Sequence, residues 1–252
     1  MGQQMGILPL KATMDNMTFY KSKHDGMLVK KQSKIPKERI QNDPNFAVLR
    51  KNNIEFTNVG KACKLLRKAV NAVTAGVADG RSTSRLMGLM AKAVQADLVN
   101  PRGKRNVVDG DLSLLEDFNF NKNADIAAVL KVEPKHSIDR VTGELKISIP
   151  AFDPVAKLIA PKDATHFKVI SAGAELNFPN KGIKNADYES AYIAMDAGAT
   201  SVIDIVHQLP ANSAHPLFLL LGVTFFRNLN GDYEPAGGFE FNALGIIELS
   251  TV

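Results

Sequence analysis

Residues 217–226 read LFLLLGVTFF, the most apolar run in the chain. Ten residues are too few to span a bilayer as a helix. The run is rich in aliphatic and aromatic residues, and Gly, Pro and Asn cluster on both sides of it. These features predict a strand that is buried in the protein core.

Further strand candidates lie around this run, at short intervals. Glu144–Ile149 alternates apolar and polar residues after the turn Val141–Gly143. The other candidates are Ala127–Val132, His166–Leu176, Ser190–Met195, Ser201–Val206 and Phe239–Leu249. Many short strands separated by turn residues are typical of an antiparallel β-sandwich. We therefore predict a β-sandwich domain over residues 121–252.

Helices are predicted upstream of the sandwich. Asp43-Pro44 is a typical helix start, because Asp caps the first turn and Pro fits its first position. Apolar residues then recur at helical spacing and form one face: Leu49, Phe56, Val59, Cys63, Leu66, Val70 and Val73. We expect Phe46 and Phe56 in the core. A second helix starts near Ser82–Ser84 and completes an antiparallel helical hairpin. A short helix over Leu112–Asp117 follows, with Asp111 as its cap.

The N-terminal segment has the pattern of a β-meander. Strands are predicted at Ile7–Met14, Met17–Ser22 and Met27–Lys31, with turns at Asp15-Asn16 and Asp25-Gly26. The predicted fold class is thus α+β. An N-terminal domain of residues 1–120 holds the meander and the helical hairpin, and the antiparallel β-sandwich follows.

The charge is unevenly distributed along the chain. Residues 1–105 hold 20 Lys and Arg and 7 Asp and Glu, a net charge of +13. Residues 106–252 hold 11 and 19, a net charge of −8, so that the whole chain carries +5. Such asymmetry indicates an anionic partner for the basic half, and the acidic half of another copy is one such partner.

The composition is that of a foldable globular chain: 252 residues, 45% of them hydrophobic. Cys63 is the only cysteine, which excludes an internal disulfide. The first residues have neither the pattern of a secretory signal nor that of a myristoylation site. We expect cytoplasmic synthesis without a signal peptide or a membrane span, with the protein either kept in a reducing compartment or released as part of an assembled particle.

Catalytic signatures are missing from the sequence. None of the five histidines has a metal-ligand spacing to another, and there is no G-x-S-x-G motif. Cys63 lies on the apolar helix face, which favours burial over reactivity. Ala236-Gly237-Gly238 lacks the following Lys and the helix of a phosphate loop. We therefore expect no enzyme activity, no metal site and no cofactor.

The leading prediction is a non-enzymatic structural protein that assembles head-to-tail with itself. Its product would be a filament, a tube, a ring or a phage-like particle. The N-terminal strand is apolar and contains Pro9, so it suits either an edge position in its own domain or the edge of a neighbour's sheet. The predicted assembly residues are Ile7, Leu8, Leu10, Lys61, Lys64 and Lys68.

Nucleic-acid binding by the basic half is the alternative. Clustered Lys and Arg side chains are suited to phosphate contacts, although few aromatic residues lie among them. The candidate residues are Lys21, Lys30, Lys31, Lys61, Lys64, Arg67, Lys68, Arg102, Lys104 and Arg105. Solvated helix faces explain the same charges without any ligand. A glycan-binding or enzymatic β-sandwich is the third reading.

Several short motifs resemble a group of uncharacterised bacterial proteins. In order along the chain they are G-I-L-P-L-K (6–11), T-F-Y-K (18–21), N-D-P-N-F (42–46), R-K-N-N-x-E-F (50–56), G-K-A-x-K-L-L-R (60–67), G-x-R-N (103–106) and D-R-x-T-G (139–143). The last of these leads into a strand that ends in I-P-A. The resemblance spans most of the chain and implies that the motifs serve the architecture. It transfers no catalytic residue.

Overall fold

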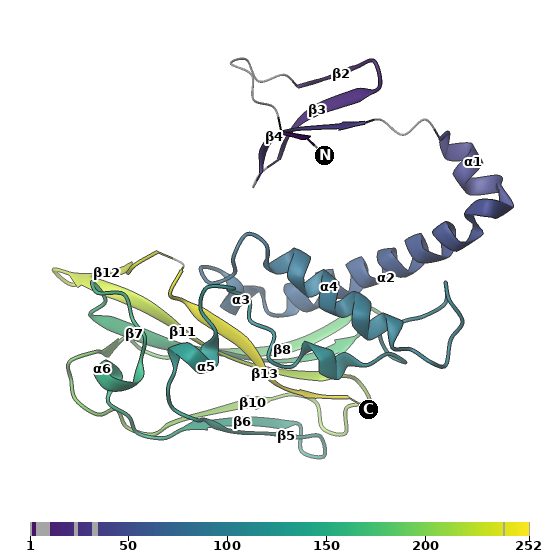
Figure 1. The fold of residues 1–252 in the computed structure, drawn as a ribbon. Coiled ribbons are helices and arrows are strands. Elements are labelled where there is room, and N and C mark those ends of the chain that lie inside the picture. The colour runs from purple at the N-terminus through teal and green to yellow at the C-terminus, as the bar shows by residue number, and fades with distance from the viewer. Residues whose placement is uncertain (1, 4–10, 23–24, 32–34, 239, 252) are drawn as a thin grey trace. The chain divides into compact units, whose positions relative to one another are not determined.

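The computed structural model describes residues 2–3, 11–22, 25–31, 35–238 and 240–251. The chain divides into two compact units, residues 1–50 and 51–252. The predicted α+β class is confirmed (Figure 1): an N-terminal antiparallel sheet and a helical pair precede antiparallel sheets that include a curled half-barrel.

The first unit contains the predicted meander. Strands β2 (Ala12–Met14), β3 (Met17–Ser22) and β4 (Gly26–Lys31) pair in sequence, and β1 (Gly2–Gln3) pairs with β4. The backbone is left-handed at Asp15 (φ 51°) and Gly26 (φ 74°), as tight hairpin turns require. Ile7, Leu8 and Leu10, which were predicted to form the assembly strand, lie outside the described residues.

The predicted helix start at Asp43-Pro44 is confirmed. After α1 (Lys37–Asn42), the Asp43 carboxylate accepts a hydrogen bond from the Asn45 N–H at 2.9 Å and caps the turn η1 (Pro44–Phe46). The long helix α2 (Ala47–Ala69) follows directly. Local capping chemistry was therefore enough to locate this boundary.

The helical pair consists of α2, the turn α3 (Asn71–Thr74) and α4 (Ser82–Gln95). The predicted apolar face is buried from Val59 onward, where it meets the core of the second unit. The prediction that Phe56 belongs to the core is wrong, since 62% of its surface is exposed. Leu49 is also exposed, because the core begins only at Val59. The turn η2 (Leu112–Leu115) confirms the predicted short helix, capped by Asp111.

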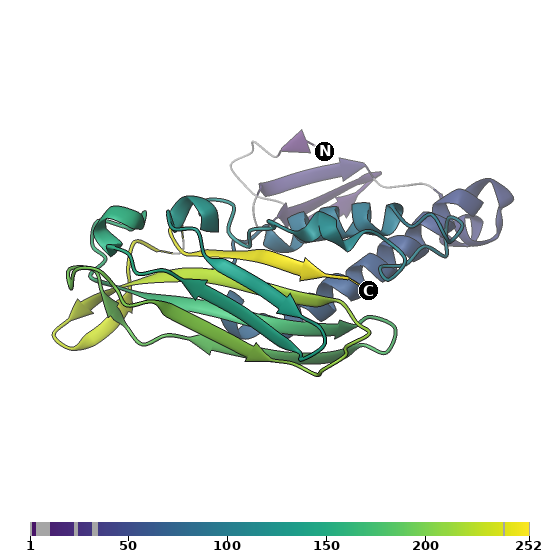
Figure 2. The same cartoon turned by 90° about the horizontal axis from the view of Figure 1, so that it is seen from below.

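The larger C-terminal sheet has six strands around β11. They are β7 (His166–Asn177), β8 (Gly182–Glu189), β9 (Ile193–Ala194), β11 (Leu217–Leu229), β12 (Asp232–Pro235) and β13 (Ala243–Ser250). β11 pairs with β7, β12 and β13, all antiparallel, and is buried from Leu217 to Phe225. The run LFLLLGVTFF therefore forms the central buried strand, as predicted. Figure 2 shows these long strands side by side, with β13 in yellow.

The smaller C-terminal sheet has three strands in the order β10-β6-β5. They are β5 (Lys135–Asp139), β6 (Glu144–Ile149) and β10 (Ile203–Gln208). In Figure 1, α4 and the C-terminal part of α2 lie on one side of the larger sheet and the smaller sheet lies on the other. Along β11, Phe218 and Leu220 pack toward the helices, whereas Leu219 and Leu221 pack toward the smaller sheet. The strand is continuously apolar because both of its faces are covered.

The helices and the C-terminal sheets share a core, so the compact units divide at residue 50, whereas the sequence predicted a domain boundary near residue 120. Leu66 and Met90 of the helices belong to the same hydrophobic cluster as Leu220 and Leu244 of the sheet. The segment around residue 120 pairs with β13, where the Phe120 N–H donates to the Leu244 carbonyl at 2.8 Å.

The predicted strand Ala127–Val132 is wrong. Residues Ile126–Val129 form the short helix α5, because the Asp125 carboxylate caps it by accepting from the Ala127 N–H at 2.9 Å. The predicted strand Ser190–Met195 shrinks to the two residues of β9. Strands β5, β8 and β12 and the turn α6 (Pro154–Lys157) were not predicted.

Candidate interaction surfaces

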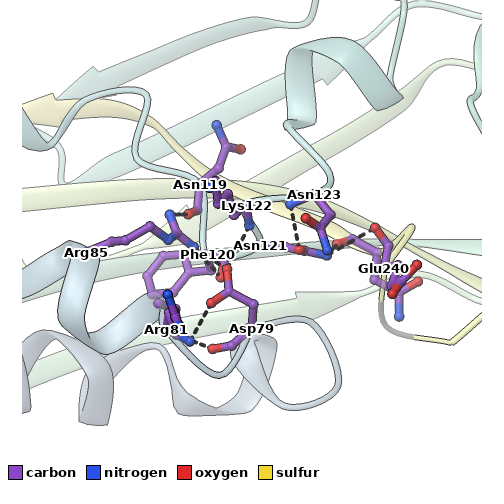
Figure 3. A network of polar contacts seen from close by, with 11 residues as sticks. Asp79, Arg81, Arg85, Asn119, Phe120, Asn121, Lys122, Asn123 and Glu240 are labelled. Carbon is purple, nitrogen blue, oxygen red and sulfur yellow. Dashed lines mark hydrogen bonds and ion pairs between the residues drawn. The ribbon is translucent and has the colours of Figure 1, made fainter. Parts of the chain in front are cut away.

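A polar network around Asp79 joins the helical pair to the larger sheet (Figure 3). The Asp79 carboxylate accepts from the Arg81 N–H at 2.6 Å, from the Lys122 N–H at 2.8 Å and from the Arg85 guanidinium at 2.5 Å. Arg85 also donates to the Phe120 carbonyl at 3.1 Å. Burial by itself would raise the pKa of Asp79, but these hydrogen bonds and the guanidinium hold it below its usual value.

Two asparagines extend these contacts into the sheet. Asn121 donates to the Asn242 carbonyl at 2.8 Å, and Asn242 donates to the Gly76 carbonyl at 3.0 Å. The Asn242 side-chain oxygen accepts from the Phe225 N–H at 3.0 Å. Each of these groups is committed to a fixed backbone partner. The network therefore positions the elements and leaves no reactive group directed at a ligand.

The D-R-x-T-G turn is also architectural. The Asp139 carboxylate accepts from the Val141 N–H at 2.8 Å and from the Thr142 hydroxyl at 2.8 Å. The Arg140 guanidinium donates to the Ser213 carbonyl at 2.9 Å and to the Ser250 hydroxyl and carbonyl. Gly143 has φ 76°, and a Cβ there would lie 2.2 Å from the Leu209 carbonyl oxygen. The turn thus ties the end of β13 to the smaller sheet.

One serine–histidine pair is buried between the two C-terminal sheets. The Ser171 hydroxyl lies 2.8 Å from His207 Nε2 and donates to the Leu220 carbonyl at 2.7 Å. His207 Nε2 therefore carries the proton and is the donor to Ser171. Burial lowers the pKa of His207 to about 4. Because the serine proton points to a carbonyl and both residues are buried, the pair has the geometry of a core hydrogen bond and not that of a nucleophile and its base.

The prediction that Cys63 is buried is confirmed, with 2% of its surface exposed. Burial raises the pKa of its thiol to about 12, which keeps it protonated at neutral pH. Among the described residues, no three His, Cys, Asp or Glu side chains gather in an arrangement that could hold a metal ion. Within the same part of the chain, every helix is too short or too polar to cross a bilayer.

Three of the predicted lysines meet in one groove of the second unit. Lys61, Lys64 and Lys68 of α2 line it together with Lys181 from the turn between β7 and β8. Its volume is about 800 Å³. The apolar part of its lining consists of Ala62, Leu65, Val107, Val108, Phe178 and Pro179. Asp109 is the acidic residue of the lining, so the groove carries a net charge of +3. We call this site the basic groove.

Arg102 and Arg105 line a different groove of about 750 Å³ between α2 and α4. Arg102 donates to the Asn52 side-chain oxygen at 2.8 Å, and the buried Glu55 carboxylate accepts from the Gly103 N–H at 2.6 Å. These contacts tie the loop that holds the G-x-R-N motif to α2. Neither Lys104 nor Arg67 lines either groove.

The three remaining candidate lysines belong to the N-terminal sheet. By strand register, Lys21 and Lys31 are on one face of it and Lys30 is on the other. The Lys30 ammonium lies 5.4 Å from the centre of the Tyr20 ring. These three lysines therefore lie on two different faces of the described sheet.

The face that holds Lys21 and Lys31 is mainly apolar. Its other members are Ala12, Met14, Met17, Phe19, Met27 and Val29. None of these side chains is buried, and Met14 and Met17 are 58% and 52% exposed. The opposite face is more polar, with Thr13, Thr18, Ser22 and Lys30 beside Tyr20 and Leu28. We call the first surface the apolar sheet face.

Sequence reasoning missed both Lys181 and the apolar sheet face. Lys181 is more than 100 residues from the helix lysines, and nothing local marks it as their neighbour. The apolar face could have been found, because register across the two predicted hairpins aligns its residues.

No protein family, curated protein or solved structure matches this chain.

Proposed function

We propose that this chain is a non-enzymatic structural protein that assembles with copies of itself, head to tail. The observation that carries the proposal is the apolar sheet face. In residues 11–22, 25–31 and 35–50 no side chain is buried, so the described part of the sheet has no hydrophobic core. A small sheet needs its apolar face packed against another surface to be stable, and a second copy of the chain can supply that surface.

The charge pattern supports a head-to-tail arrangement. The helical segment 51–105 has 11 basic and 3 acidic residues, a net charge of +8, whereas residues 106–252 carry −8. The second unit therefore carries no net charge, but its helical segment is basic and the rest of the unit is acidic. Contacts between unlike surfaces of identical chains close into rings or continue as filaments, which includes tubes and phage-like particles.

The C-terminal sheets fit the role of a rigid building block. We read them as a β-sandwich, because Ile147 and Ile205 of the smaller sheet share a core with Val169, Leu219 and Phe225 of the larger one. A sandwich covered by helices on its other side presents fixed surfaces, which repeated contacts require.

A pair of neighbouring substitutions tests the proposal. Phe19→Lys places a charge on the apolar sheet face, and Thr18→Lys places the same charge on the opposite face. We expect Phe19→Lys to weaken association at least about tenfold and Thr18→Lys to leave it nearly unchanged, measured as particle mass by light scattering. Identical masses for the wild type and both variants would exclude this face from assembly.

Nucleic-acid binding is the second candidate, and the convergence of four lysines in the basic groove favours it. Phosphate contacts are strongly weakened by salt. Retention of DNA or RNA by the purified protein that is lost in a Lys61, Lys64 and Lys68 to Glu variant would support this candidate. Unchanged retention in that variant would exclude the groove as the binding site.

A further inference from the structure

The basic groove has the features of a docking site for an acidic segment with an apolar side. Lys61, Lys64 and Lys68 are exposed and follow one another at steps of three and four along α2, which places them on one side of the helix. Beside them, the buried Leu65 and the half-buried Phe178 supply apolar surface. A ligand that satisfies both parts carries carboxylates next to an aromatic or aliphatic group.

The hairpin of β11 and β12 offers such a segment on the same chain. All four residues of β12, Asp232 to Pro235, are exposed. Glu234 pairs with Arg227 at 2.9 Å, and Asp163 lies 3.7 Å from the same guanidinium. Asp232 adds a further carboxylate at the turn. Around the hairpin, residues 162–168, 189–196 and 226–235 together hold three basic and five acidic residues, a net charge of −2.

Aromatic side chains accompany these carboxylates. The Tyr233 ring stacks on the Tyr192 ring with centroids 3.8 Å apart and an interplanar angle of 6°. Tyr233 remains 37% exposed. Stacking holds its ring in place, so little side-chain entropy is lost when a partner covers it. Tyrosines of this kind often contribute strongly to protein–protein contacts. We call this surface the acidic hairpin.

The basic groove and the acidic hairpin lie at opposite ends of the second unit. The groove includes the turn after Asn177, the last residue of β7. The hairpin lies beyond His166, the first residue of β7, which pairs with Phe226 of β11. Figure 1 places β12 at the left end of the unit. Twelve extended residues of β7 separate the two ends, about 40 Å.

We infer that the acidic hairpin of one copy binds in the basic groove of the next. The inference rests on the proposed self-assembly and names the two surfaces that meet. Because side chains alternate along β12, Asp232 and Glu234 lie on one face of the hairpin and meet the four lysines, while Tyr233 lies on the other face and meets the apolar wall of the groove. Since the two surfaces are different and lie at opposite ends, two bound copies leave one groove and one hairpin free, and further copies add until a ring closes or a filament continues.

Charge exchange on full-length chains tests this contact. One variant carries Lys64→Glu and Lys68→Glu, and the other carries Asp232→Lys and Glu234→Lys. We expect each variant alone to associate at least about tenfold more weakly than the wild type. An equimolar mixture should reassemble, because each reversed surface meets a reversed partner. Lys92→Glu on α4 and Glu133→Lys are matched controls, since both residues are exposed and lie outside the two surfaces.

The outcomes separate this contact from the proposed function. Weak association of each variant with recovery in the mixture supports the contact. If the wild type assembles and neither variant changes its mass, the contact is wrong and self-assembly stands. A wild type that is monomeric at every concentration overturns both. If the lysine variant loses nucleic-acid retention and the mixture does not reassemble, the groove serves nucleic acid and the inference fails. Asp232→Lys alone, which leaves the Glu234–Arg227 pair intact, serves if the double variant does not fold.

Discussion

At the scale of single residues, buried and half-buried polar groups join the elements of the second unit. Asp79 joins the helices to the segment at residue 120, and Arg140 joins the turn at residue 140 to Ser250. Ser171 and His207 join the two C-terminal sheets. Gly173 permits this last contact, because a Cβ there would lie 2.9 Å from the Cβ of His207.

The buried His207 predicts a loss of stability in acid. Its folded-state pKa of about 4 lies below the ordinary value of 6.5, so the folded state binds this proton less readily than the unfolded state does. The free energy of unfolding is therefore unaffected by this group above pH 6.5. As the pH falls from 6.5 to 4, it decreases by about 3 kcal/mol in total because of His207. We expect denaturant unfolding of His207→Gln to show a correspondingly flatter decline over this range. An unchanged pH profile in the variant would contradict the assignment.

The residue contacts differ in how far the sequence could predict them. Asp43 and Asp111 were predicted as caps and are caps, because a cap acts on a backbone N–H two residues away. The pair of Ser171 and His207 spans 36 residues, and Lys181 joins lysines more than 100 residues away. Such pairs depend on strand register and helix docking, which no local pattern specifies.

At the scale of elements, the sequence predicted strands with a strong apolar pattern. β6 and β11 were found because each buries at least one whole face. β8 was missed because its sequence, GIKNADYE, has few apolar residues, and none of its side chains is fully buried. β8 forms one end of the larger sheet, so pairing with β7 specifies it more than its own composition does. The apolar residues after Asp125 are also typical of a short buried strand, and the Asp125 cap starts helix α5 there instead.

Two glycine substitutions test how the central strand and the long helix are packed. At Gly222 in β11, a Cβ would lie 2.5 Å from the Ala243 carbonyl oxygen and 2.9 Å from an Ile170 side-chain carbon. Gly222→Ala should therefore destabilise the protein by about 2–3 kcal/mol. At Gly60 in α2 a Cβ meets nothing within 4 Å. Gly60→Ala should stabilise the helix by up to about 1 kcal/mol.

Thermal and denaturant unfolding of the two variants provide the measurement. Because both substitutions add one methyl group, each controls for the other. A neutral effect of Gly222→Ala would mean that β11 and β13 are farther apart than described here. A destabilising Gly60→Ala would mean that this side of α2 is covered.

At the scale of the whole molecule, most of the uneven charge along the sequence falls within the second unit. The basic helices and the acidic sheets share one core, so the charge difference lies between layers of a single unit. Composition alone cannot reveal this, because a change in hydrophobic period marks a change of element and not the end of a core. In the first unit, none of the side chains of the apolar sheet face is buried in the described residues.

Self-assembly is the central claim, and the most direct test is the mass of the purified, nuclease-treated protein by light scattering at low and high salt, with negative-stain images of the same samples. We predict regular assemblies at low salt and smaller species at high salt, because salt screens the contacts between exposed charges. A monomer of 27.4 kDa at both salt concentrations would contradict the account.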